Sequence, residues 1–221
     1  MPDANDTSLI TFQDWTLRVR ESTGSSPRLL LLIHGLTGDE NSMWVFARNL
    51  SADYRMVAPR ALHTSGMEQG GYSWRSREDD VEDRPSLDEL RPSAEALMRL
   101  VDEYAASLGL DARLFDVMGF SQGGAMSSVL AFLYPERIRR VGILAGFVPG
   151  GLEELVSQRP LEGKLFFVTH GTKDETVPIE RARDSVRVLE QAGARVTYCE
   201  DEVGHKVSAT CLRALKDFFA D

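Results

Sequence analysis

Apolar runs alternate with amphipathic stretches along most of the chain, from about residue 28 to the C-terminus. The run RLLLLIH is continuous, as expected for a strand buried on both faces of a parallel sheet. Further strands are predicted at YRMVAP, RLFDVMGF, RIRRVGILAG, KLFFVTHG and ARVTYCE. Helices are predicted between them at SMWVFARNL, from about Ser93 to Leu108, and at QGGAMSSVLAFLY, GLEELVSQ, PIERARDSVRVLEQAG and SATCLRALKDFFAD. This alternation predicts an α/β fold, with a mostly parallel central sheet and helices on both faces.

Two segments depart from the alternation. Near the N-terminus, SLITF and WTLRVR are typical of two short strands that form a hairpin at a sheet edge. Residues 60–92 show no clear period and are rich in Gly, Ser, Arg, Asp and Glu. A loop this long inside a compact domain is usually functional or disordered. We therefore predict a single domain over residues 1–221, with residues 60–92 as an excursion over its surface.

Composition narrows the classes of function. The 221 residues carry a net charge of −9, which disfavours a surface that tracks nucleic-acid phosphates. No apolar run approaches the roughly 20 residues that a membrane span needs, and MPDANDTSLI does not resemble a signal peptide. Cys199 and Cys211 fit neither a disulfide framework nor a metal motif, and are typical of a reducing compartment. We expect a soluble, cytoplasmic protein with no stable membrane association.

The first candidate for chemistry is GFSQGG, residues 119–124, where a predicted strand turns directly into a helix. Such a turn holds a serine with its Oγ projecting above the sheet. The positions two before and two after the serine crowd each other, which favours glycine at Gly119 and Gly123. The alternative is a glycine-rich turn with an unreactive serine. Because partners for a nucleophile follow in the sequence, we favour Ser121 as the nucleophile.

A serine nucleophile near neutral pH needs a base, and the base needs an acid that orients it. In the α/β-hydrolase order the acid and then the histidine follow the serine. Two histidines follow Ser121, His170 and His205. GHKVS places His205 after the last strand, at the carboxyl edge of the sheet, where open α/β sheets bind ligands. We favour His205 as the base, and expect His170 to be a buried, hydrogen-bonded structural residue.

The acid is expected between the serine and the histidine, also directly after a strand. HGTKDETVP offers Asp174 in this position, although an aspartate there is also suited to cap the following helix. Asp184 falls inside a predicted helix, and Asp201 is disfavoured because it is so close to His205 in sequence. We therefore favour Asp174.

An oxyanion hole needs two convergent N–H donors, and LLLLIHGLTG supplies the second. Gly35 allows the sharp backbone turn that would present the Leu36 N–H beside the Gln122 N–H. We expect His34 to hold this loop through hydrogen bonds. Apolar residues on the rim are candidates for the substrate pocket, with core packing as the alternative for several of them: Met43, Trp44, Tyr72, Trp74, Phe147 and Val177. The sequence predicts no metal ligands and no cofactor.

Taken together, IHGLTGDE, GFSQGG, HGTKDETVP and GHKVS resemble the phospholipase/carboxylesterase family of α/β-hydrolases, which includes the acyl-protein thioesterases. The resemblance extends from about residue 28 to the C-terminus. It implies an α/β-hydrolase fold, with Ser121 as nucleophile and Asp174 and His205 as its partners. It also implies Leu36 and Gln122 as oxyanion donors and no cofactor.

We predict a serine carboxylesterase that hydrolyses short- to medium-chain carboxylic esters of small molecules through an acyl-enzyme. The argument for chain length is SREDDVEDRPSLDEL, residues 76–90, which has seven acidic and two basic residues. Such a segment suits a solvated rim better than an apolar tunnel, and burying methylenes is favourable only against apolar walls. Two alternatives stay open. One is an acyl-protein thioesterase or lysophospholipase acting on long acyl chains, and the other is a catalytically inactive binding protein with a hydrolase fold.

Overall fold

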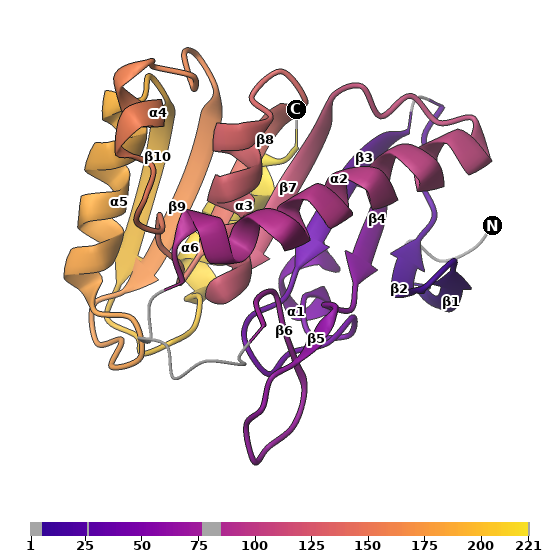
Figure 1. Ribbon diagram of the computed structural model, residues 1–221, viewed down its shortest axis with the longest axis horizontal. Helices are drawn as coiled ribbons and strands as arrows, with labels where there is room; N and C mark the ends of the chain where they lie inside the picture. Colours follow the sequence, from indigo (N-terminus) through magenta and orange to yellow (C-terminus); the bar gives the residue numbers. More distant parts are fainter. Residues whose placement is uncertain (1–5, 26, 77–84, 221) are drawn as a thin grey trace.

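The computed structural model describes residues 6–25, 27–76 and 85–220. One sheet organises this part of the chain (Figure 1). Its eight described strands lie in the spatial order β1 (Ser8–Phe12), β2 (Trp15–Arg20), β4 (Tyr54–Pro59), β3 (Arg28–Ile33), β7 (Phe115–Phe120), β8 (Ile138–Leu144), β9 (Leu165–Gly171) and β10 (Arg195–Asp201). β1 pairs with β2, and β2 with β4, antiparallel. All later neighbours are parallel. The predicted parallel sheet and the N-terminal edge hairpin are both confirmed.

Apolar side chains on both faces of the sheet explain the continuous run of β3. Leu29, Leu31 and Ile33 belong to one hydrophobic cluster, while Leu30 and Leu32 belong to another on the opposite face. Successive strand residues point to opposite faces, so a strand covered on both sides needs apolar residues throughout. The first face is covered by α2 (Leu87–Leu108), α3 (Gln122–Leu133), α4 (Glu153–Ser157) and α5 (Ile179–Gln191), and the second by α1 (Trp44–Ala47) and α6 (Ala209–Phe218).

The helix predicted from Ser93 begins six residues earlier, at Leu87. Its start is a capping box: the Ser86 side chain accepts the Glu89 N–H, and the Glu89 carboxylate accepts the Ser86 N–H at 2.7 Å. Pro92 lies within the helix, close to its start, although proline more often marks the beginning or end of a helix. The capping box and the burial of Leu87 and Leu90 outweigh the one helical hydrogen bond that proline removes.

The excursion over residues 60–92 also contains more regular structure than its sequence indicates. Its described part includes a short antiparallel hairpin, β5 (His63–Thr64) with β6 (Tyr72–Ser73). Tyr72 forms a bridge to Gly38, in the loop that follows β3. Residues 77–84, the centre of the acidic stretch, lie outside the described residues. The excursion is therefore fastened to the carboxyl edge of the sheet by backbone hydrogen bonds.

The expectation of unpaired cysteines is wrong. Cys199 in β10 and Cys211 in α6 form a disulfide bond, with their Cα atoms 5.8 Å apart. The two positions are only 12 residues apart in sequence. They meet because α6 returns across the second face of the sheet and packs against β10. The spacing of two cysteines carries no signal for such a contact, which depends on how the helix packs on the strand.

Candidate active site

Four loops at the carboxyl ends of parallel strands bring the predicted site residues together. Leu36 follows β3, Ser121 follows β7, Asp174 follows β9 and His205 follows β10. A parallel sheet places the carboxyl ends of its strands at one edge, where helix N-termini also point. Residues from four distant segments therefore meet at a single edge of the sheet.

Ser121 occupies a sharp turn between β7 and α3, with φ of +54°. Only a strained backbone gives a serine this conformation, and such strain is concentrated at functional sites. The neighbouring glycines are required by close contacts. A Cβ on Gly119 would lie 2.0 Å from the Gly123 carbonyl oxygen, and a Cβ on Gly123 would lie 2.0 Å from the Ile33 carbonyl oxygen. The crowding expected on either side of Ser121 is confirmed.

Asp174 binds His205 and is itself held by the backbone. Its Oδ2 lies 2.7 Å from His205 Nδ1, and its Oδ1 accepts the N–H groups of Thr176 and Val177 at 2.9 Å each. A carboxylate can only accept, so His205 Nδ1 carries the proton and leaves Nε2 available as a base. Asp174 does not cap α5, whose N-cap residue is Pro178 without a side-chain cap.

The second histidine also reaches Asp174. His170 Nε2 lies 3.3 Å from Asp174 Oδ2 and 2.7 Å from the Val177 carbonyl oxygen. Its side chain is fully buried, and burial lowers its pKa, so it is neutral near pH 7. The proton sits on Nε2, the nitrogen that faces the Val177 carbonyl. Its Nδ1 has no partner among the described residues. His170 is buried and hydrogen-bonded, as the sequence predicted.

Ser121 and His205 line the same cavity, of about 880 Å³. Within the described residues, Ser121 makes no hydrogen bond to His205, and the ring of His205 rests against Phe120 with centroids 4.9 Å apart. Hydrogen bonds between catalytic groups are often long without substrate and tighten in the complex. The His205 side chain is 24% exposed, whereas Asp174 is fully buried. The imidazole of His205 is therefore accessible to a ligand that enters from solvent, while the Asp174 carboxylate is shielded from water.

Leu36 and Gln122 line this cavity as well. Among the described residues, neither of their backbone N–H groups donates to another group. The Gln122 N–H belongs to the first residue of α3, where the helix dipole favours negative charge. The Gln122 side chain is occupied elsewhere: its Oε1 accepts the Trp74 N–H at 3.0 Å, and its Nε2 donates to the Ser73 hydroxyl at 3.2 Å. Both residues thus line the cavity with backbone N–H groups that have no acceptor among the described residues.

The loop after β3 is fixed by His34 and by the β5–β6 hairpin. His34 Nδ1 lies 2.7 Å from the Gly35 carbonyl oxygen, and its Nε2 accepts the Ala61 N–H at 3.1 Å. Burial lowers the pKa of His34, which keeps the ring neutral in this double role. The Thr37 N–H donates to the Tyr72 carbonyl at 3.0 Å. His34 holds the loop by hydrogen bonds, as expected.

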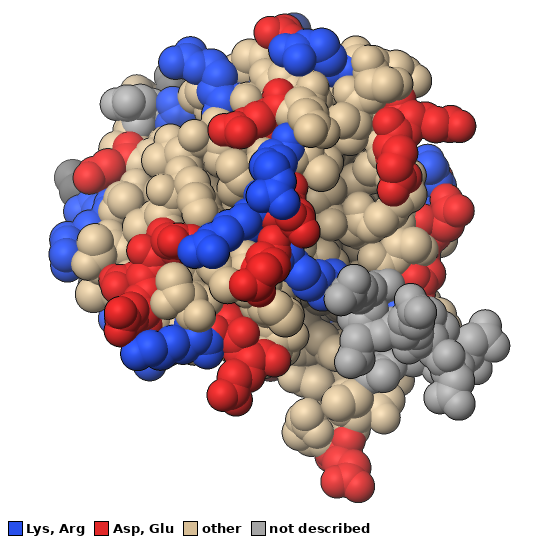
Figure 2. All heavy atoms as spheres, turned by 90° about the vertical axis from the view of Figure 1, so that its left-hand side faces the viewer, with Lys and Arg blue, Asp and Glu red and all other residues tan. Residues whose placement is uncertain are grey.

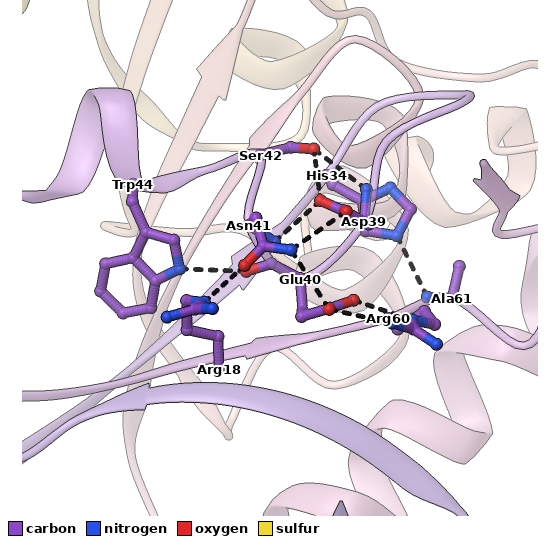
Figure 3. Close-up of polar contacts among 9 residues, drawn as sticks. All are labelled: Arg18, His34, Asp39, Glu40, Asn41, Ser42, Trp44, Arg60 and Ala61. Carbon is purple, nitrogen blue, oxygen red and sulfur yellow. Dashed lines mark hydrogen bonds and ion pairs between the residues drawn. The ribbon is translucent and has the colours of Figure 1, made fainter. Parts of the chain in front are cut away.

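Polar side chains that the sequence did not single out anchor the far side of this loop (Figure 3). The buried Glu40 carboxylate receives two hydrogen bonds from Arg60, at 2.8 and 2.9 Å. Asn41 donates to Glu40 and accepts from Arg18. The Arg60 interaction lowers the pKa of Glu40, so the carboxylate stays charged at neutral pH. The sequence could have indicated Glu40, because Asp39 and Glu40 form an acidic pair in the loop after β3, but nothing in it marked Arg60.

Of the six candidates for the substrate pocket, Phe147 and Val177 line the cavity. The structure places the other four elsewhere. Met43 and Trp74 are buried in the two hydrophobic clusters. The Trp44 indole N–H donates to the Glu40 carbonyl, and the ring packs on the α1–α6 face.

The fourth, Tyr72, lies against the Arg60 guanidinium at 4.8 Å. Its side chain therefore packs behind the loop that follows β3 and does not form the cavity wall. The cavity also has apolar lining residues outside those six candidates. Met67 belongs to the 60–92 excursion, and nothing in the sequence marked the others: Val45, Phe46, Pro85, Phe120 and Pro178.

Charges of both signs are interleaved on the molecular face that carries α5 (Figure 2). Ion pairs join Arg183 to Glu200, Arg187 to Asp184, and Arg159 to Glu162. The described basic side chains of these pairs are thus matched by acidic neighbours. Within the described residues, no helix has the length and apolarity to cross a membrane, and no group of three or more His, Cys, Asp or Glu residues is arranged to hold a metal ion.

Comparison with known proteins gives a consistent result. The model of the family described as Phospholipase/Carboxylesterase matches residues 16–221. The chain is 30% identical to carboxylesterase SOBER1 of Arabidopsis thaliana over 105 residues, which is 46% of either chain, so it spans about half the length of that relative. It is 24% identical to acyl-protein thioesterase 1 of Debaryomyces hansenii, over 80% of this chain and 82% of the relative.

Solved structures share the fold. A carboxylesterase from Bacillus cereus superposes with a TM-score of 0.80 at 21% identity, over 94% of both chains. A carboxylesterase from Mesorhizobium loti superposes with the same TM-score at 23% identity, over 96% of this chain and 97% of the other. The fold is therefore that of the α/β-hydrolases, with a mostly parallel central sheet.

Proposed function

Because this chain belongs to the phospholipase/carboxylesterase family of α/β-hydrolases, we propose that it is a serine carboxylesterase acting on small-molecule esters. The observation that carries the proposal is the 2.7 Å bond between His205 Nδ1 and Asp174 Oδ2, in the same cavity as the strained Ser121. A bond there fixes the tautomer that leaves His205 Nε2 as a base. The family membership and the geometry support the same chemistry.

The proposed reaction has two stages. Ser121 Oγ attacks the ester carbonyl carbon while His205 Nε2 takes its proton, and the oxyanion is stabilised by the Leu36 and Gln122 N–H groups. The bond to the alkoxy group then breaks as His205 returns the proton to the departing alcohol. Water, deprotonated by His205, next cleaves the acyl-enzyme. Asp174 keeps the imidazole oriented and stabilises its charged form. No step requires a cofactor, and an amide donor at the oxyanion contributes about 10²–10³-fold in turnover.

The direct test is the Ser121→Ala variant. We expect it to lose ester hydrolysis and labelling by a fluorophosphonate probe, because the proposed acyl-enzyme forms on Ser121 Oγ. Its unfolding free energy should stay within about 1 kcal/mol of the parent, since Ser121 Oγ makes no hydrogen bond among the described residues. Turnover within tenfold of the parent would contradict the nucleophile assignment. A folded parent that neither labels nor hydrolyses any ester would instead support the inactive binding protein.

We further propose that short- and medium-chain esters are the preferred substrates. The charged segment over residues 76–90 supports a solvated rim, and its described part includes Glu89, which pairs with Arg75 at the edge of the cavity. A specific observation favours the alternative of long acyl chains. Val45 and Met67 line the cavity and are 56% and 38% exposed, which leaves apolar surface for a chain to cover.

A series of p-nitrophenyl esters from butanoate to hexadecanoate distinguishes a preference for short acyl chains from a preference for long ones. For a solvated rim, kcat/KM should peak between butanoate and octanoate. For an apolar groove, it should climb throughout the series, because each buried methylene contributes about 0.8 kcal/mol. In the second case a Met67→Ala variant should lower kcat/KM for the long esters and leave butanoate unchanged. Thioester substrates of matched acyl length then separate an esterase from a thioesterase.

The cytoplasmic location, the single domain and the absence of nucleic-acid partners stay predictions. Disulfide bonds persist mainly in oxidising compartments, so the Cys199–Cys211 bond counts against a reducing location. Fractionation of cells followed by detection of the enzyme would decide the compartment.

A further inference from the structure

The loop that carries His205 is enclosed by the disulfide bond. Cys199 lies in β10, His205 lies in the loop between β10 and α6, and Cys211 lies in the first turn of α6. The bond thus closes a short ring of backbone that contains the proposed base.

Upstream of His205, the backbone is held by the end of β9. The Thr172 N–H donates to the Asp201 carbonyl at 2.9 Å, and the Lys173 N–H donates to the Val203 carbonyl at 3.0 Å. The packing is close, since a Cβ on Gly171 would lie 2.2 Å from the Val203 oxygen. This side of the loop is therefore fixed by noncovalent backbone contacts.

Downstream of His205, the support is different. Between His205 and Leu212 the buried residues are Ser208 and Cys211, and the next buried residue of α6 is Leu215, a full turn later. Ser208 caps the helix, its hydroxyl accepting the Cys211 N–H at 3.1 Å. The cap fixes the loop to α6, and towards the sheet the noncovalent support is the packing of the partly buried Val207 and Leu212 on the hydrophobic cluster of the second face. The disulfide joins this first turn to β10, and so fixes the downstream side of the loop.

We propose that the Cys199–Cys211 pair positions His205 against Asp174, and that reducing the bond lowers turnover reversibly. The proposal rests on the proposed function of His205 as the base. Without the link, the first turn of α6 and the residues before it keep only the partial packing of Val207 and Leu212, so they can shift away from β10. A displacement of about 1 Å at a catalytic group costs on the order of 10²-fold in rate.

The chemical step is thiol–disulfide exchange with a dithiol. One thiolate of the reductant attacks a sulfur of the pair, and the protein S–S bond breaks to release a cysteine thiolate. The second thiol of the reductant then attacks the mixed disulfide. Two electrons and two protons pass to the protein, which carries two thiols, and the reductant becomes a disulfide. Cys211 is buried and Cys199 is half-buried, so attack is expected on the Cys199 side.

The experiment compares the oxidised enzyme with the enzyme reduced by dithiothreitol, using p-nitrophenyl butanoate. Titration should find two thiols per chain after reduction and none before. We expect kcat to fall at least about tenfold with KM within about threefold, and to recover on reoxidation. A Cys199→Ala/Cys211→Ala double variant should have the same low kcat as the reduced enzyme, and dithiothreitol should not change it. Fully reduced enzyme that keeps kcat within twofold would overturn the proposal.

A control separates positioning from general destabilisation. Val101→Ala removes buried apolar volume from α2, on the other face of the sheet, and leaves the His205 loop untouched. Assayed well below its unfolding temperature, it should keep the parent kcat. A matching loss of kcat in this variant would show that the disulfide acts only through overall stability, which contradicts a positioning role.

Amide hydrogen exchange gives a readout that does not depend on catalysis. Reduction should speed exchange selectively over residues 202–212, since these lose their covalent link. Unchanged exchange in the reduced protein would overturn the proposal even if ester hydrolysis is present. If exchange rises as expected but Ser121→Ala or His205→Ala keeps full esterase activity, the proposed function fails and the structural role of the bond stands.

Discussion

Asp174 is the residue on which the site is centred. It is fully buried and accepts from His205 and from two backbone N–H groups, with His170 close to the same oxygen. A buried carboxylate is tolerated only when its oxygens are satisfied. His170 does not line the cavity. Its contacts with Asp174 and the Val177 carbonyl make it a support for the acid.

At this scale we predict a clear difference between the two histidines. His205→Ala should reduce kcat by about 10³-fold or more, because the members of the proposed triad would act as a unit. His170→Ala should reduce kcat by no more than about 30-fold, because it removes only a contact to Asp174 and leaves the base in place. His170→Gln, whose amide can reach the Val177 carbonyl, should recover part of that loss. The measurement is kcat of each folded variant for p-nitrophenyl butanoate across the pH range. A larger loss of kcat in His170→Ala than in His205→Ala would show that His205 is not the base.

Among the elements, the turn from β7 into α3 has the least tolerance for change. Gly123 packs against the backbone of β3, where the Ile33 carbonyl oxygen would lie 2.0 Å from an added Cβ. This contact is backbone against backbone, so it cannot be relieved by moving a side chain. Gly150, by contrast, has no atom within 4 Å of an added Cβ.

Gly123→Ala should therefore lower the free energy of unfolding by about 3 kcal/mol or more, because α3 must move away from β3. For a chain of this size, that corresponds to a fall in Tm of at least about 6 °C. The esterase activity should fall with it, since Gln122 moves with the helix. Gly150→Ala is the matched control and should change the free energy of unfolding by less than about 1 kcal/mol. Equal thermal stability of the two variants, measured by calorimetry, would rule out the close contact.

On the scale of the whole molecule, the buried histidines make stability depend on pH. Burial lowers the pKa of both His34 and His170 in the folded protein. At pH 7 both rings are neutral in the folded state. Below the ordinary histidine pKa of about 6.5, these two histidines bind protons in the unfolded chain but stay neutral in the folded chain. The unfolded state then gains stability relative to the folded state as the pH falls.

We therefore predict that the free energy of unfolding is constant just above pH 7 and falls between about pH 6.5 and 5. The slope should reach at most about 1.4 kcal/mol per pH unit for each of these histidines. Urea unfolding across this range is the measurement. His170→Gln should make the slope shallower, whereas the same substitution at the half-buried His63 serves as the control. A slope unaffected by His170→Gln would show that other groups are responsible.

The sequence by itself determined the features that depend on local sterics and on strand patterning. The patterning located every strand of the parallel sheet. The clearest signal came from central strands such as β3, because a strand covered on both faces must be apolar throughout, whereas the edge strand β10 has a mixed pattern and is partly exposed. The glycines around Ser121 indicated the sharp turn, because the crowding arises within a few residues of the serine. The order of Ser121, Asp174 and His205 followed from the chain because each comes directly after a strand, and parallel strands end at one edge.

Tertiary structure decided which distant side chains meet. Arg60 reaches Glu40 because β4 lies beside β3 in the sheet, a neighbour relation that no local pattern encodes. Some of the six pocket candidates line the cavity and others are buried away from it. Sequence cannot separate them, because the burial of each side chain depends on where α1 and the β5–β6 hairpin pack. Cys199 and Cys211 pair because α6 lies across β10. Contacts of this kind depend on the three-dimensional arrangement of whole elements, and the residues involved are chemically ordinary until that arrangement exists.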